Sequence, residues 1–243
     1  MTDVGDDAKL MLRLGLPSSL HESFIEKHFK RDEDDSVLEQ LHVAVTKLRK
    51  NTMKAAEVTK AVFADEMKTV AMRHKTARKA GYDLYLKATP LIDDAVAKAQ
   101  AAIGEIDKLT RGPAPPRDLL GEARQREMRE AFARLPEERR KGLIDEALKH
   151  DDDHLIGALL AVDGWVSGFA PLEQEMLRHR WSSKHFPEVL DRKKRIESAI
   201  ADTQRIPPVA LRFIDELTDR KLVESAEKME KQAAEALKAA AAG

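Results

Sequence analysis

Cysteine is absent from the 243 residues of this sequence, and aromatic residues make up only 5% of it. The missing cysteine excludes disulfide bonds, thiolate nucleophiles and cysteine-ligated zinc sites. The scarcity of aromatic rings means that the core must be mostly aliphatic. An excess of charge is lacking as well, because 42 basic residues stand against 43 acidic residues and the formal net charge is −1. The overall charge therefore favours neither nucleic acid nor an anionic membrane as a partner.

Long apolar runs are also lacking. No stretch approaches the ~20 apolar residues that a membrane-spanning helix requires. The N-terminal stretch "MTDVGDDAKLMLRLGL" starts with acidic residues, whereas a signal peptide starts with basic residues and continues into a longer apolar run. We therefore expect a protein that does not enter a membrane and is not secreted through a signal peptide.

The residues that are present are typical of helices. Hydrophobic residues make up 42% of the chain and charged residues 35%, a profile that is typical of long helices and coiled coils. No sustained alternation of apolar and polar residues indicates a β-strand. The sequence therefore predicts an all-α fold, with a long helical hairpin or coiled-coil-like rod, a bundle of short helices and a C-terminal helix.

The longest predicted helix, the rod, covers residues 36–86, which contain no proline and have their first glycine at Gly81. Its stripe of apolar and small residues advances in steps of three and four: Leu38, Leu41, Val45, Leu48, Thr52, Ala56, Thr59, Phe63, Met67, Val70 and His74. At about 1.5 Å per residue, this helix would be on the order of 75 Å long. We expect Pro90 to break the helix and to start a second one over residues 91–109, which folds back as a helical hairpin.

The returning helix is shorter than the rod, so it would leave part of the apolar stripe uncovered. Soluble monomers rarely expose such a strip. We expect either self-association through residues 36–60 or docking of the helices predicted at 19–30 or 209–238 onto the strip. The residues predicted for self-association or partner docking are Leu38, Leu41, Val45, Leu48, Phe63 and Met67.

Prolines divide the rest of the chain. The stretch "TRGPAPPRD", residues 110–118, combines three prolines with a glycine and predicts a stiff linker. After it, short helices are predicted at about 118–135, 136–150, 153–163, 171–181 and 187–204. Another break is expected at Pro207 and Pro208. The predicted domains are the N-terminal helix and hairpin over 1–110, the short-helix bundle over 117–206 and a C-terminal amphipathic helix over 207–243.

The stretch "KHDDDHLIG", residues 149–157, raises the question of a metal site. His150 and His154 would share a face on one continuous helix and could bind a metal there. The familiar helical zinc motif, however, has a glutamate beside the first histidine and takes a third ligand from elsewhere. We interpret the stretch as the seam between two helices. His150 ends the first, where positive charge is favourable, and Asp152 or Asp153 caps the second.

Other candidate motifs fail on their spacing. "RDEDDS" lacks the glycine that a calcium loop needs at its sixth position, because counting from Asp32 places Val37 there. "GWVSGF" does not have the G-x-S-x-G order of a nucleophile elbow, and we interpret it as a turn with Trp165 and Phe169 packed into the bundle. The phosphate-binding glycine motifs are absent. We therefore expect no catalytic residues, no metal site and no cofactor.

The strongest local charge lies in "RHRWSSKHFPEVLDRKKR", residues 178–195. With Trp181 and Phe186 between the cations, this segment could contact phosphates and stack on bases. The other interpretation is a solvated face that pairs with acidic groups of a neighbour, and the balanced overall charge favours it. The residues predicted for nucleic-acid contact under the first interpretation are Arg178, Arg180, Lys184, Arg192, Lys193, Lys194 and Arg195.

The stretch "LIDEALKHDDDHLIGALLAVDGWVSGF", which follows "RGPAPPRD", resembles a pattern in uncharacterised helical proteins of tailed phages and prophages. In those proteins a helix, an acidic turn and a further helix follow a proline-rich linker and an N-terminal coiled region. The resemblance covers about residues 110–170 and implies a phage origin. It carries no catalytic residues and no mechanism.

These observations predict a non-enzymatic structural or assembly protein of a phage particle, which acts by helix-mediated self-association or docking. The expected partners are further copies of the chain or other structural proteins of the same particle, without a membrane. The expected location is the virion or the cytoplasm of the bacterial host. The alternatives are a nucleic-acid-binding accessory protein that uses residues 178–195 and, less favoured, an enzyme with a metal at His150 and His154.

Overall fold

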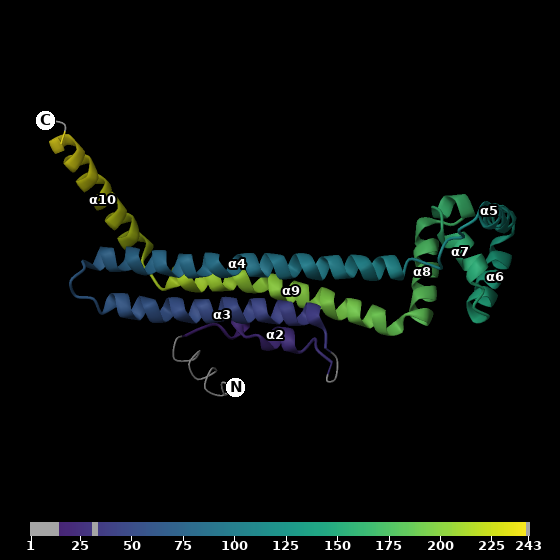
Figure 1. Ribbon diagram of the computed structural model, residues 1–243, viewed down its shortest axis with the longest axis horizontal. Helices are drawn as coiled ribbons and strands as arrows, with labels where there is room; N and C mark the ends of the chain where they lie inside the picture. Colours follow the sequence, from purple (N-terminus) through teal and green to yellow (C-terminus); the bar gives the residue numbers. More distant parts are fainter. Residues whose placement is uncertain (1–14, 31–33, 242–243) are drawn as a thin grey trace. The chain divides into compact units, whose positions relative to one another are not determined.

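The structure is a computed structural model that describes residues 15–30 and 34–241. Every regular element of these residues is a helix, which confirms the predicted all-α class (Figure 1). The elements in chain order are η1 (Ser18–Leu20), α2 (Ser23–Glu26), α3 (Ser36–Phe63), α4 (Val70–Leu109), α5 (Leu119–Ala133), α6 (Glu137–Lys149), α7 (Asp153–Leu160), η2 (Gly164–Ser167), α8 (Pro171–His185), α9 (Pro187–Glu216) and α10 (Arg220–Ala241). Among the described helices, none is long and apolar enough to cross a membrane.

The helices form two compact units. The long-helix unit consists of the described residues of 1–100 and 195–243, and the short-helix unit consists of residues 101–194. The helices α4 and α9 each contribute residues to both units, because the unit boundaries fall inside them. The division therefore differs from the predicted one, in which the N-terminal part ended at residue 110 and the C-terminal helix began at residue 207.

In the long-helix unit, α3 lies beside α4 and α9 (Figure 1). Small side chains allow this close packing. A Cβ atom added to Gly81 of α4 would lie 2.8 Å from the Ile214 side chain of α9 and 3.8 Å from Ala55 of α3. The three helices therefore meet at a position where α4 has no side chain.

The predicted rod over 36–86 is wrong, because α3 ends at Phe63 and α4 begins at Val70. In the turn between these helices, side chains form hydrogen bonds with backbone groups that would pair with each other in a continuous helix. The Asp65 carboxylate accepts a hydrogen bond from the Met67 N–H at 3.1 Å, which is a local alternative to helical bonding. Arg73 donates to the Phe63 carbonyl at 3.0 Å and so satisfies an acceptor at the end of α3.

The predicted helix breaks at three prolines are also wrong. Pro90 lies inside α4, and Pro207 and Pro208 lie inside α9. A proline in a helix interior removes one backbone hydrogen bond and costs about 3 kcal/mol. Buried side chains near these prolines offset this cost, including Ile92 after Pro90 and Ile206 before Pro207. Packing on the neighbouring helices thus keeps both helices continuous.

The segment predicted as one helix over 19–30 forms two shorter pieces, η1 and α2, and α2 packs on α3 (Figure 1). Leu20 and Ile25 are fully buried in this contact region. The carboxylate of Asp35 then caps α3 by accepting from the Val37 N–H at 3.0 Å. The chain itself therefore provides the cover for the start of α3.

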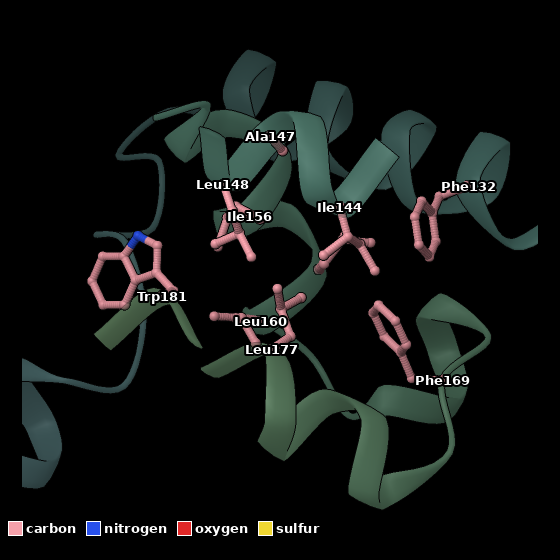
Figure 2. Packing of buried hydrophobic residues seen from close by; sticks show 10 residues of the cluster. Phe132, Ile144, Ala147, Leu148, Ile156, Leu160, Phe169, Leu177 and Trp181 are labelled. Atoms are coloured by element: carbon pink, nitrogen blue, oxygen red, sulfur yellow. The ribbon is translucent and has the colours of Figure 1, made fainter. Parts of the chain in front are cut away.

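The short-helix unit has its own core. Its buried side chains come from α5, α6, α7, α8 and the turn after η2: Phe132, Ile144, Ala147, Leu148, Ile156, Leu159, Leu160, Phe169, Leu177 and Trp181. Figure 2 shows Leu148 and Ile144 of α6 pointing toward Leu177 of α8. The rings of Phe132 and Phe169 have centroids 5.3 Å apart. Phe169 is packed as predicted, but Trp165 is 76% exposed, contrary to the prediction.

Candidate docking surfaces

The structure removes most of the predicted self-association surface. Leu38, Leu41, Val45 and Leu48 are completely buried inside the long-helix unit, so they cannot form an interface between folded copies. Two further residues were predicted to lie on that surface. The Phe63 ring is half-buried against the His74 ring, with centroids 4.6 Å apart, and Met67 is 96% exposed.

Charged side chains hold the segment with η1 and α2 against the buried apolar face of α3. Arg49 of α3 is only 1% exposed, and its Nε lies 2.6 Å from Oε2 of Glu22. The Arg49 Nη2 donates a hydrogen bond to the other Glu22 oxygen at 2.8 Å, so the ion pair includes one charge-assisted hydrogen bond. His28 contacts Asp202 of α9 at 2.9 Å. The segment that covers α3 is therefore held by charged as well as apolar contacts.

Most of the cations in the basic segment 178–195 form hydrogen bonds with other groups of the same chain. Its cations contact acidic side chains or carbonyl oxygens as follows: Arg178 with the Arg111 carbonyl at 3.0 Å, Arg180 with Asp145 at 2.7 Å, Lys184 with Asp151 at 2.5 Å, Lys193 with Asp107 at 2.6 Å and Arg195 with the His28 carbonyl at 3.2 Å. The hydrogen bond from Lys184 lowers the pKa of Asp151. Of the other two predicted contacts, Arg192 is half-buried and Lys194 is exposed.

The aromatic residues of this segment are not arranged as a stacking platform. Trp181 is 4% exposed and belongs to the core of the short-helix unit. Its indole N–H donates to the Asp153 carboxylate at 3.0 Å. Phe186 is half-buried beside it, with ring centroids 5.5 Å apart. These contacts favour the protein-facing interpretation of the segment.

The interpretation of "KHDDDHLIG" as a helix seam is confirmed. His150 follows the last residue of α6 as its C-cap. Asp152 caps α7, because its carboxylate accepts from the His154 and Leu155 N–H groups at 3.1 Å each. Asp151 between them has φ +56°, the left-handed conformation that often follows a helix. Among the residues that the structure describes, no group of three or more possible metal ligands is found.

The short-helix unit exposes a concave apolar surface between α6 and α8, which we call the α6–α8 groove. It encloses about 260 Å³ and is lined by Glu137, Arg140, Lys141, Ile144, Asp145, Phe169, Glu173, Met176, Leu177 and Arg180. Ile144, Phe169 and Leu177 form a buried floor, whereas Met176 is 57% exposed. Methionine is common at adaptable docking surfaces because its side chain is flexible and polarizable.

Charged pairs border the groove. Lys141 donates to Glu137 along α6 at 2.5 Å, and this hydrogen bond lowers the pKa of Glu137. Arg180 of α8 contacts Asp145 of α6 at 2.7 Å. The Glu173 carboxylate accepts from the Ala170 N–H at 2.8 Å, at the N-terminus of α8. The rim therefore carries both signs of charge around an apolar floor.

The helix α10 exposes the second apolar surface. Its first turns are docked, because Val223 and Ala226 are buried and Glu230 forms an ion pair with Lys75 of α4. The described residues from 227 to 240 are all exposed. They continue the apolar stripe through Met229, Ala233 and Leu237, and Leu237 is 72% exposed. The stripe of one helix is thus buried at its start and open at its end.

Sequence reasoning anticipated the second surface but missed the first. The C-terminal segment was already predicted to be amphipathic, and a helix over 209–238 was one of the candidates for docking. The groove could have been suspected from α8, because Leu172, Met176 and Leu177 place apolar side chains on more than one face of that helix. Neither a protein-family model nor a curated protein nor a solved structure matches the chain.

Proposed function

We propose that this chain is a non-enzymatic structural or assembly protein of a phage particle, and that it acts by helix-mediated self-association or docking. The observation that carries the proposal is the exposed apolar stripe of α10 from Met229 to Leu237. Exposed apolar patches commonly mark interaction sites. The sequence resemblance over residues 110–170 supports the phage origin.

Polar groups inside the long-helix unit support a structural role. Asp215 of α9 accepts from the Arg78 side chain at 2.8 Å and from the Tyr82 hydroxyl at 2.6 Å, both on α4. The hydrogen bond to Asp215 raises the pKa of Tyr82. The cluster joins two helices.

The experiment that tests the proposal removes the exposed part of α10. Deleting residues 227–243 should abolish concentration-dependent self-association in sedimentation or light scattering, and should abolish incorporation into particles purified from the strain that carries the gene. The control is Lys231→Glu, an exposed change on the charged face of α10, which should leave both readouts unchanged. If the deleted chain still associates and is still incorporated, α10 does not carry the function.

A further inference from the structure

We propose that α10 of one copy of this chain docks in the α6–α8 groove of a second copy. The inference deepens the proposed assembly function and rests on it. One surface is a protruding apolar stripe and the other is an apolar hollow. A helix that lays its apolar face into a groove is a common mode of recognition between proteins.

The dimensions of the groove suit a side chain. Its volume of about 260 Å³ lies below the range of about 300–1,000 Å³ that is usual for sites of drug-sized ligands. Met229, Ala233 and Leu237 follow one another at four-residue spacing, so they lie on one face of α10. Leucine or methionine can fill the hollow over Ile144, Phe169 and Leu177, and the small Ala233 lets the helix approach closely.

The charges of both surfaces are balanced. The groove is lined by three acidic residues and three basic ones: Glu137, Asp145, Glu173, Arg140, Lys141 and Arg180. The exposed part of α10 likewise carries three of each: Glu227, Glu230, Glu235, Lys228, Lys231 and Lys238. An anionic membrane or a nucleic acid would call for a basic surface. The balanced charges of α10 and of the groove instead suit contact between two copies of this chain.

This pairing has a geometric consequence. The helix and the groove are different surfaces, so each copy can both donate a helix and accept one. Reciprocal exchange of α10 between two copies gives a closed dimer, and donation to a further copy gives rings or open chains. The inference therefore predicts dimers or larger species as the protein concentration rises.

Two single variants test the pairing. Leu237→Glu makes the helix defective and Met176→Glu makes the groove defective, and both side chains are exposed, so each variant should stay folded by circular dichroism. Each variant alone should associate at least about tenfold more weakly than the parent chain, because a buried apolar anchor is lost. Mixed at equal concentration, the two should form a 1:1 heterodimer that grows no further. The intact helix of one fills the intact groove of the other.

Each matched control changes an exposed residue of the short-helix unit or of α10 that belongs neither to the groove lining nor to the apolar stripe. Leu119→Glu in α5 does not alter the groove lining, and Lys231→Glu lies on the charged face of α10. Both should associate like the parent chain, which the same sedimentation experiment measures.

Three outcomes would overturn the pairing. They are self-association of Met176→Glu at parental strength, absence of a heterodimer in the mixture, and a parent chain that stays monomeric at all concentrations. None of these refutes the assembly function if deletion of residues 227–243 still prevents incorporation into particles, because α10 would then dock on another protein.

Discussion

The ion pair between Arg49 and Glu22 predicts a large loss of stability when one partner is removed. Arg49 is 1% exposed, its Nε lies 2.6 Å from one Glu22 oxygen, and its Nη2 donates a hydrogen bond to the other oxygen at 2.8 Å. Removing one member of a buried pair leaves a charge without its main partner and costs about 3–5 kcal/mol. We expect Glu22→Gln to lower the free energy of unfolding by roughly this amount. The whole free energy of unfolding of a domain is only about 5–15 kcal/mol.

Urea unfolding followed by circular dichroism measures this loss. An unchanged slope of the free energy of unfolding against urea concentration would show that the variant and the parent chain expose the same surface when they unfold. The matched control is Glu26→Gln in the same segment. Glu26 contacts His42 at 3.2 Å with 54% of its side chain exposed, so its removal should cost at most about 1 kcal/mol. The double variant Glu22→Leu with Arg49→Met should recover most of the loss, because an apolar pair of similar size needs no charge compensation. A cost for Glu22→Gln no larger than that for Glu26→Gln would refute the reasoning.

Three further predictions concern packing, pH and nucleic acid. Gly81→Ala should destabilise the chain by about 0–2 kcal/mol, because the overpacking cost of about 1–3 kcal/mol exceeds the helical gain of about 1 kcal/mol. Gly142→Ala, whose added Cβ meets nothing within 4 Å, should stabilise by about 0.5–1 kcal/mol in the same unfolding assay. Burial alone would raise the pKa of Asp202, but hydrogen bonds from Lys27 and His28 lower it below 3.8. Its stabilisation is therefore full above the unfolded-state pKa and is lost as pH falls through the folded pKa, so Asp202→Asn should lose less stability than the parent between pH 5 and pH 3. Fluorescence anisotropy should detect no tight binding of DNA or RNA to residues 178–195 at physiological salt, and tight binding that weakens steeply with added salt would contradict this.

The sequence by itself determined the helical class and the ends of several short helices. Asp118 caps α5 by accepting from the Gly121 N–H at 2.6 Å, at the predicted start of that helix, and Asp152 caps α7, as one of the two predicted capping residues. The helix α6 begins at Glu137, directly after Pro136 and next to the predicted start at 136, with Glu137 and Glu138 in its first turn. Caps and first turns depend on neighbours within about four residues, so the local sequence contains nearly all of their energy.

The tertiary structure alone decided where the long helices end and which apolar residues stay exposed. Pro90 and the pair Pro207 and Pro208 each carry a local penalty that favours a break, but burial of distant side chains keeps α4 and α9 continuous. Leu41 is buried and Leu237 exposed, although both lie on similar stripes. Helical periodicity shows that a stripe must find apolar contacts, but the neighbouring helices that cover it come from far along the chain.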